Sequence, residues 1–344
     1  MKVIEVRPTT IERVEDQPTS AVPPLRRQTI EPQAASADYR HWWPMTLGAA
    51  IVEAITSSQI EGIHATVTQA YLAFMQPQHP AVTDAGRAVA ANIYAVLDAF
   101  NGSVTYATHH IAHAKLMRGQ GTDEYAGGYR TTNVRVGTHV GPAPRRVQEL
   151  MEDLAAFVHD RPATIVNAAV AHAQFETIHP YPDGNGRIGR ALLAGHLGLP
   201  LSAYIAERRF VYYDALRDFR LGDAGPIFRL VAHAAAAGID LLREATQQLD
   251  GWDDGLSRDA KRLAARARHI LLGTREHMMG GVNASTAAAL VELEDAGVVR
   301  EVTGDLGRNT LLAFIPVFAG WAHLADPDVY GTKSETTWIR RLAC

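Results

Sequence analysis

His-Pro-Tyr-Pro-Asp-Gly-Asn-Gly-Arg-Ile-Gly-Arg, residues 179–190, is the stretch that decides how this chain folds. The residues before it, Asn167–Phe175 (NAAVAHAQF), are rich in alanine and predict a helix, and a second helical pattern, Arg187–Leu197, follows it. The Gly-Asn-Gly of residues 184–186 stands just before that second helix. Glycines let the backbone approach a ligand, and free N–H groups at a helix start attract anions. The stretch therefore predicts a phosphate-binding loop between two helices.

The other side chains of this stretch fit the same chemistry. Arg187 and Arg190 are three residues apart, so a helix places both on one face beside the anion site. Asp183 offers a hard oxygen ligand, and Mg²⁺ needs only one or two carboxylates besides phosphate oxygens. His179 precedes the loop, where a neutral imidazole can take a proton from an incoming hydroxyl. Together these groups indicate attack on a phosphorus centre.

Three other interpretations of the stretch compete with this one. Gly184–Gly189 also satisfies G-x-G-x-x-G, with Glu207 at a tolerable distance, but the dinucleotide fingerprint needs a preceding strand and here a helix precedes. A Walker loop needs Gly-Lys-Ser/Thr, which this stretch lacks. A helix-capping loop with a buried histidine explains the glycines and the aspartate. It does not explain two arginines beside a histidine.

Position by position, residues 179–190 resemble the signature H-P-F-x-D-G-N-G-R-x-x-R of the Fic family, with Tyr181 in place of the usual phenylalanine. The preceding residues, Phe175–Ile178, resemble the helix that leads into the family's loop. Fic proteins are helical and mostly transfer AMP from ATP to a Ser, Thr or Tyr hydroxyl of a protein. The resemblance implies a mainly α fold with a small β-hairpin flap. It also implies a protein adenylyltransferase that uses ATP and Mg²⁺ on a target protein and on itself.

The resemblance also assigns roles to single residues. His179 would be the catalytic base, and Asp183 would hold Mg²⁺. The residues expected to bind the phosphates of ATP are Gly184, Asn185, Gly186, Arg187 and Arg190, the last at the γ-phosphate. Tyr212 and Tyr213 resemble a pair that borders the nucleotide base, although packing on a helix face explains them nearly as well.

The segment Gly128–Val136 resembles the family's flap, a hairpin that docks the target by strand addition. Glycines and prolines punctuate residues 119–146, which predicts a loop with a small hairpin there. The residues expected to dock the target are Tyr129, Arg130, Thr131, Thr132, Asn133 and Val134.

A second motif, Ser57-Ser58-Gln59-Ile60-Glu61-Gly62, has the form S-x-x-x-E-G. Ser57 and Glu61 share a helix face, and Glu61 is unfavourable at the negative end of a helix dipole. Taken alone, a surface glutamate before the C-cap Gly62 explains the pattern. However, the motif resembles the family's inhibitory motif [ST]-x-x-x-E-[GN]. The resemblance implies that Glu61 pairs with Arg190 in the γ-phosphate site. As a further hypothesis, a glutamate placed near a phosphodiester could orient a water, so the same site could also remove AMP.

The chain divides into three parts by pattern. We expect an N-terminal segment with the inhibitory helix at about 45–62, a Fic catalytic domain and a winged-helix-like domain, at residues 1–100, 101–248 and 256–344. Residues 1–38 are polar and contain prolines, and Asp250–Gly255 has the composition of a linker. The winged-helix expectation rests on a sequence of helix, strand, turn and strand at 285–296, 298–302, 303–308 and 310–315.

The composition limits the class of protein. The 344 residues are 47% hydrophobic and 20% charged with a formal charge of −4, and the single cysteine, Cys344, excludes a disulfide within the chain. We see no secretory signal and no apolar run of membrane-spanning length, so we expect a cytoplasmic protein without a membrane partner. The H-H-x-x-H cluster of His109, His110 and His113 lacks the glutamate of a zinc protease, which favours packing histidines over a zinc site.

A second function from a different class remains open. The C-terminal module has eleven basic and ten acidic residues, but Arg262, Arg266, Arg268 and Arg308 could form a small basic face. The chain could then be a DNA-binding regulator whose Fic domain senses a nucleotide. Dimerisation or target docking by this module is at least as well supported. Transfer of UMP or a phosphate group instead of AMP is a lesser enzyme alternative.

Overall fold

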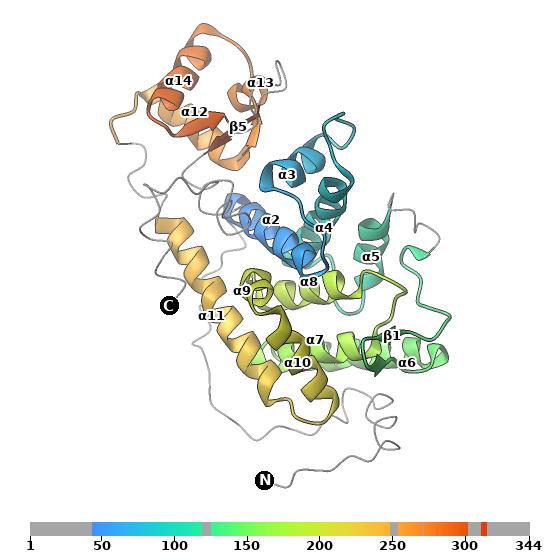
Figure 1. Cartoon of the computed structure of the whole chain (residues 1–344). Coiled ribbons are helices and arrows are strands. Elements are labelled where there is room, and N and C mark those ends of the chain that lie inside the picture. Colours follow the sequence, from blue (N-terminus) through green and yellow to red (C-terminus); the bar gives the residue numbers. More distant parts are fainter. Residues whose placement is uncertain (1–42, 119–124, 248–253, 271, 302–310, 315–344) are drawn as a thin grey trace.

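The computed structural model describes residues 43–118, 125–247, 254–270, 272–301 and 311–314 (Figure 1). Most of these residues are helical, and the sequence predicted this. The helices up to residue 247 are α2 (Trp43–Ile60), α3 (Val67–Met75), α4 (Asp84–Phe100), α5 (His109–Met117), α6 (Val147–His159), α7 (Ile165–Ile178), α8 (Asn185–Leu197), α9 (Ser202–Glu207), α10 (Arg209–Arg220) and α11 (Gly225–Gln247), with a short 3₁₀ helix at Pro144–Arg146 before α6.

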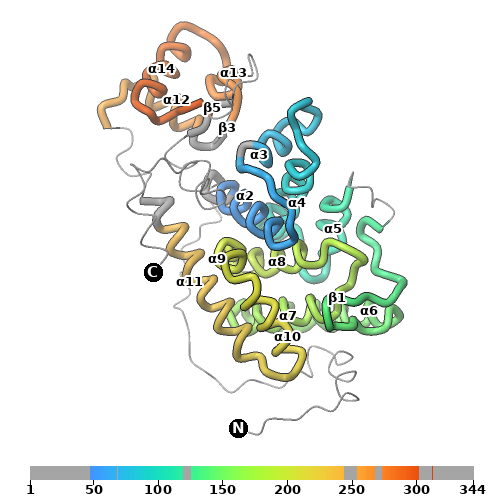
Figure 2. The backbone as a smooth tube through the Cα atoms, viewed as in Figure 1, coloured from blue at the N-terminus to red at the C-terminus, as the bar shows by residue number. Residues whose placement is uncertain are grey.

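Helices α7 and α8 form the centre of this helical body. All of Ala168–Ile178 in α7 is buried, so the helix needs no polar face and shows none in its sequence. On one side α8 packs against α2, α4 and α5, while on the other α7 packs against α6, α10 and α11 (Figure 2). The loop between these two central helices is therefore enclosed by elements from both sides of the body.

Helix α2 is anchored deeply in the body. The amide of Asn92 in α4 donates to the Ala54 carbonyl at 3.1 Å and to the Ser58 hydroxyl at 3.3 Å. The buried Glu53 carboxylate accepts the backbone N–H groups of Leu201 and Ser202 at the start of α9, both at 2.7 Å. These contacts hold the last turns of α2 at a fixed position over α8.

The predicted hairpin is present but short. Strand β1 (Arg135–Val136) pairs antiparallel with β2 (His139–Val140), in the register Arg135↔Val140 and Val136↔His139. The two residues between the strands include Gly137, whose φ of 60° belongs to the left-handed region that such tight turns need. Most of the alternating stretch before Arg135 is thus loop.

The C-terminal unit contains α12 (Arg258–Ile270), α13 (Arg275–Met279) and α14 (Ala284–Asp295) with strands β3 (Leu272–Thr274), β4 (Val299–Glu301) and β5 (Leu311–Phe314). The strands form an antiparallel sheet in the order β3-β5-β4. The predicted end of α14 at Gly297, with φ 70°, and the two strands that follow are present, while β3 was not predicted. Helix α12 contacts α2, and the unit shares a hydrophobic core cluster with α2, α3 and α4.

One expectation about membranes needs correction. Among the described residues, Gly225–Arg243 of α11 is long and apolar enough to cross a membrane by length and composition alone. Half of that window is buried in the fold, where α11 packs on α7, α9 and α10, as the core helix of a globular protein does. Several sequence-based expectations lie outside the described residues: those on residues 1–38, the linker at 250–253, the turn at 303–308 with Arg308, the side chain of Arg268, and Cys344.

Candidate active site

The loop between α7 and α8 has two left-handed residues at its ends. His179 ends α7 with φ 50°, and it is the one described residue other than glycine with a positive φ. Gly184 precedes α8 with φ 79°. Directly after Gly184, the buried side chain of Asn185 accepts the Tyr181 N–H at 2.9 Å and donates to the Tyr181 carbonyl at 2.8 Å. Asn185 therefore closes the loop instead of facing a ligand with its side chain.

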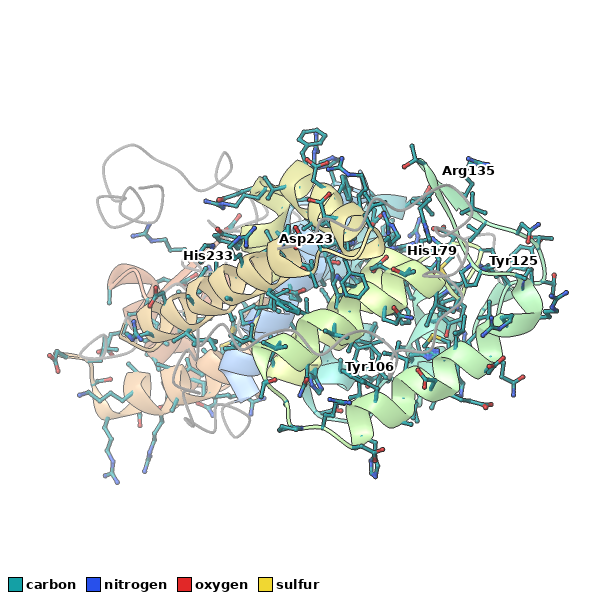
Figure 3. All side chains as sticks on the ribbon, turned by 90° about the horizontal axis from the view of Figure 1, so that it is seen from below. Tyr106, Tyr125, Arg135, His179, Asp223 and His233 are labelled. Atoms are coloured by element: carbon teal, nitrogen blue, oxygen red, sulfur yellow. The ribbon has the colours of Figure 1, made fainter. Side chains whose placement is uncertain are left out.

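The ring of His179 lies at the end of α7 and is mostly buried, with 15% of its side chain exposed. Burial lowers the pKa of His179 to about 4, and a hydrogen bond to the backbone of Glu176 only partly opposes this. The imidazole is therefore neutral at pH 7, the state that a general base requires. In Figure 3, His179 lies on the same side of the helical body as Arg135 of the hairpin and away from His233.

Asp183 is the exposed residue of the loop, with 68% of its side chain accessible. One carboxylate oxygen accepts the Gly184 N–H at 2.6 Å, and the other lies 3.9 Å from the Arg187 guanidinium. Its backbone carbonyl lies 3.0 Å from Nε2 of His113 in α5. Because Nδ1 of His113 accepts the Gly127 N–H at 2.9 Å, Nε2 carries the proton and donates to Asp183.

The histidines of α5 thus serve the loop as packing groups. The His113 ring stacks on Tyr181, with centroids 3.6 Å apart and planes at 3°. Burial lowers the pKa of both His109 and His113, to about 3 and about 4, so both rings are neutral. Within the described ranges no group of three or more histidines, cysteines and acidic residues is arranged to hold a metal ion. His113 thus packs on Tyr181 and holds the loop through the Asp183 carbonyl.

Arg187, in the first turn of α8, is buried, with 4% of its side chain exposed. Its Nη2 approaches the sulfur of Met117 at 4.0 Å, a weak contact. Its Nε and Nη1 are buried and find no hydrogen-bond partner among the described residues. A buried guanidinium at a helix start, with two nitrogens that lack hydrogen-bond partners, is suited to bind an anionic ligand.

Arg190, one turn later, is buried and fully engaged with α2. Its Nε donates to the Ser57 hydroxyl and its Nη2 to the Ser57 carbonyl, both at 2.9 Å. Nη2 also donates to Oε1 of Glu61 at 2.6 Å. Although burial alone would raise the pKa of Glu61, the charge of Arg190 holds it below its ordinary value. The structure therefore brings Ser57, Glu61 and Arg190 together from residues far apart in the sequence.

Glu61 also covers the start of α8. A Cβ added to Gly186 would collide with the Glu61 carboxylate, so glycine is required there while Glu61 occupies this position. Gly62, with φ 77°, ends the turn that carries Glu61. The hydroxyl of Tyr213 in α10 donates to the Ile60 carbonyl at 3.1 Å and so fastens the same turn.

Tyr212 is buried behind the arginine and not beside an open nucleotide pocket. Its hydroxyl lies 3.0 Å from Nε2 of His172, and the Arg190 guanidinium lies 6.0 Å from its ring centroid. Tyr213 is 43% exposed. Of the pair, only Tyr213 presents a surface that a ligand could reach.

The flap residues fall into two groups. Thr131, Thr132 and Asn133 are exposed, as residues that meet a target must be, and Tyr129 and Val134 are half-buried. Arg130, in contrast, is buried, and its guanidinium donates to the carbonyls of His179 (2.8 Å), Thr132 (3.0 Å), Pro142 (2.6 Å) and Ile178 (3.2 Å). Its side chain ties the flap to the end of α7, so it is not available to a target.

Comparison with known proteins agrees with this geometry. The segment 103–197, which runs from before α5 to the end of α8, matches the model of the Fic/DOC family. A crystal structure of a Fic family protein from Desulfovibrio desulfuricans G20 aligns with a TM-score of 0.50 and 21% identity, over 91% of this chain and 98% of that one. The predicted Fic fold, mainly helical with a small two-stranded sheet, is confirmed.

Proteins similar to this chain include named enzymes. Protein adenylyltransferase Fic of Culex quinquefasciatus is 32% identical over 167 residues, which are 46% of this chain and 32% of that protein. Protein adenylyltransferase fic-1 of Caenorhabditis elegans is 36% identical over 121 residues, which are 33% of this chain and 24% of that protein. The chain thus spans a third or less of the length of these relatives.

Sequence reasoning missed three residues of the site. Glu176 lies one turn before His179 and is buried, and Asn92 and Glu53 fix α2. The i,i+3 spacing of Glu176 from His179 was visible in the sequence. No sequence signal pairs Asn92 or Glu53 with their partners, which lie 38 and 148 residues away.

Proposed function

We propose that this chain is a protein adenylyltransferase that transfers AMP from ATP to a hydroxyl side chain of a protein, and that Glu61 restrains it. The Fic domain and the names of its relatives support the reaction class. The observation that carries the proposal is Arg187, a buried guanidinium in the first turn of α8 whose Nε and Nη1 have no hydrogen-bond partner among the described residues. The neutral base His179 stands at the other end of the same loop.

The residues of the chain account for each part of the transfer. The oxygen of the target hydroxyl attacks the α-phosphorus of ATP and forms a new P–O bond, while the bond to the leaving pyrophosphate breaks. His179, neutral because burial lowers its pKa to about 4, takes the hydroxyl proton. The N–H groups at the start of α8, with Arg187, hold the phosphates and stabilise their charge.

A magnesium ion fits the loop through Asp183. Its carboxylate is exposed beside the expected phosphate position, and one of its oxygens lies 3.9 Å from the Arg187 guanidinium. One carboxylate suffices when phosphate oxygens complete the shell. When bound, the ion would neutralise charge on the phosphates and on the leaving pyrophosphate.

The restraint rests on the contact of Glu61 with Arg190. Arg190 is the second arginine of the site, and a 2.6 Å ion pair with the chain's own carboxylate occupies it. A terminal phosphate that needs Arg190 must displace that carboxylate, so ATP would bind in an unproductive position while Glu61 stays. The proposed resting state is therefore largely inactive.

The test uses ATP labelled at either end. The full chain with Glu61→Gly should transfer label to protein, itself included, from α-labelled ATP but not from γ-labelled ATP. The wild-type chain should transfer less, and Glu61→Gly combined with His179→Ala should transfer none. Label from the γ-position, or equal transfer with and without His179, would reject the proposal. Mass spectrometry of the modified protein gives the transferred mass and the residue type.

The same geometry suggests a reverse activity. Glu61 covers Gly186 at the start of α8, where a phosphodiester of a modified target would lie, and a carboxylate there could orient a water. Wild-type protein with Mg²⁺ should then release AMP from a pre-modified target, and Glu61→Gly should not. Equal release by both forms would remove this role from Glu61.

We also propose that the C-terminal unit is a winged helix that docks protein and not DNA. The order of helices and strands, with the sheet order β3-β5-β4, supports the fold. In such modules the last helix before the wing reads DNA, yet α14 (ASTAAALVELED) carries three acidic residues and no basic one. Salt-sensitive retention of the full chain on duplex DNA would contradict this and favour a DNA-binding regulator.

A further inference from the structure

Glu176 is a buried carboxyl group that the proposed reaction has not yet used. It lies in the last turn of α7, and its side chain is 8% exposed. Its Oε1 has no hydrogen-bond partner among the described residues. A buried acid without partners costs a folded protein stability, and a group kept at such a cost is often part of a functional site.

The carboxyl group points toward the proposed base. Oε2 of Glu176 lies 4.0 Å from Nδ1 of His179, one helical turn later in the sequence. Space for the carboxyl is made by α8, because a Cβ added to Gly189 would collide with Oε1 of Glu176. Gly189 therefore leaves room for the acid beside the histidine.

We propose that Glu176 is a positioning residue that orients His179 and stabilises its ring once the ring has taken the proton of the target hydroxyl. This inference rests on the proposed transferase function. The proton moves from the hydroxyl to the imidazole, which becomes a cation, and an ionised Glu176 beside it favours that cation. The proton leaves His179 to solvent after pyrophosphate has gone, so the acid itself is not consumed.

Its surroundings decide when Glu176 is ionised. Burial raises the pKa of Glu176 to about 7. The charged and titratable groups that face it come from α7 itself, α8, the end of α2, α10 and the segment before α5: His179, Arg190, Glu61, Arg220, Tyr212 and Tyr106. The two arginines favour the ionised acid, whereas Glu61 opposes it. Support for His179 is therefore present above about pH 7 and is lost as the pH falls.

The first test needs no enzymatic activity. Ring signals of His179 in the full chain, assigned with His179→Ala, are followed by NMR from pH 5 to pH 9. Glu176→Gln keeps the shape of the side chain and removes its charge, and Glu149→Gln, an exposed acid on α6, is the matched control. The wild-type and control proteins should show an inflection near pH 7, and Glu176→Gln should show none. A wild-type protein without this inflection overturns the proposal, as does an inflection that persists in Glu176→Gln.

The second test measures transfer in the Glu61→Gly background. Glu176→Gln should lower kcat roughly tenfold, the effect of losing one charged partner, with KM for ATP unchanged. The rise of kcat between about pH 6 and 8 should also flatten. An unchanged kcat and pH profile overturns the proposal. If no variant transfers AMP but the NMR inflection is present, the transferase function is rejected while the coupling of Glu176 to His179 stands.

Discussion

Arg187 and Arg190 lie one turn apart on α8, and both are buried, yet their surroundings are opposite. Arg190 donates to Ser57 twice and to Glu61, so the chain itself satisfies it. The Nε and Nη1 atoms of Arg187 have no hydrogen-bond partner among the described residues, and its Nη2 has only a weak contact to a sulfur and a long ion pair with Asp183 at 3.9 Å. We call Arg190 with its partners Ser57 and Glu61 the closed half of the proposed anion site, because the protein itself fills it. Arg187 is the open half, because it is left for a ligand.

The difference shows how a site can be preorganised and restrained at once. A buried, unpaired guanidinium costs folding free energy, and a bound phosphate would recover part of that cost. A buried ion pair of good geometry holds its arginine without any ligand. Under the proposed function, this structure keeps the inner phosphate position open and closes the outer one.

Replacing the two arginines by methionine should have the largest effects and should separate the two surroundings. In the Glu61→Gly background, Arg187→Met should lower AMP transfer about a hundredfold, since charge-assisted hydrogen bonds contribute about 3 kcal/mol. In the wild-type chain, Arg187→Met should leave the Tm nearly unchanged, because its ion pair with the exposed Asp183 is long, at 3.9 Å, and two of its buried nitrogens have no hydrogen-bond partner among the described residues. Arg190→Met should lower the Tm, because Ser57 and Glu61 lose their partner. Equal loss of Tm in the two variants would break the comparison.

Removing the Glu61 carboxylate should have the second largest effect on AMP transfer. Glu61→Gly should raise AMP transfer about tenfold or more, because one charged hydrogen bond of about 1.5 kcal/mol no longer competes with ATP. The rate of label transfer from α-labelled ATP measures this. Glu207→Gly, which removes an exposed carboxylate in α9, is the control and should leave the rate unchanged. A Glu61→Gly protein as slow as wild type would show that Glu61 does not hold the outer position closed.

The open and closed halves also differ in how far the sequence could predict them. The loop could be predicted because its chemistry is local: the helix before it, the glycines and both arginines lie within one short run. The partner of Arg190 was expected from the resemblance alone, since Ser57 and Glu61 lie 133 and 129 residues away. The free state of Arg187 could not be predicted, because it depends on Met117 and other packing that no local pattern records.

The same limit applies to the flap and to Tyr212. Sequence reasoning placed Arg130 with the target-docking residues, but its four carbonyl partners come from both ends of the hairpin and from the last turn of α7. An exposed and a buried arginine look alike in a loop sequence. Tyr212 looks like a ligand-facing residue for a similar reason, and only its position against His172 and Arg190 shows that it is core.

The ion pair of Glu61 with Arg190 should also make the Tm depend on pH, and this effect should be smaller than the effects on AMP transfer. The pKa of Glu61 in the folded chain is lowered by Arg190, so its ion pair contributes stability above about pH 4.5 and loses it as the pH falls. Glu61 is 38% exposed, so the contribution is modest. Wild type should exceed Glu61→Gln in Tm by about 2 °C at pH 7, and the difference should vanish toward pH 3. A difference that is constant with pH would mean that the pair is not ionic.

The smallest effect should come from removing the hydrogen bond between Tyr213 and the turn that carries Glu61. Tyr213→Phe removes the hydroxyl that donates to the Ile60 carbonyl, a hydrogen bond of about 0.5–1 kcal/mol, and should loosen the turn that carries Glu61. AMP transfer by the otherwise wild-type chain should rise about two- to fivefold, the factor that this free energy allows.

Tyr94→Phe provides the matched control for this loss. It removes an equivalent hydrogen bond, from Tyr94 to the Phe74 carbonyl at 3.1 Å, which joins α4 to α3 away from Glu61. Both variants should lose a similar amount of Tm, but only Tyr213→Phe should gain activity. A gain in both would mean that general loosening of the helical body relieves the restraint. A gain in neither would place the restraint wholly in the contacts of Arg190 with Ser57 and Glu61, because the turn then keeps its position without the hydroxyl of Tyr213.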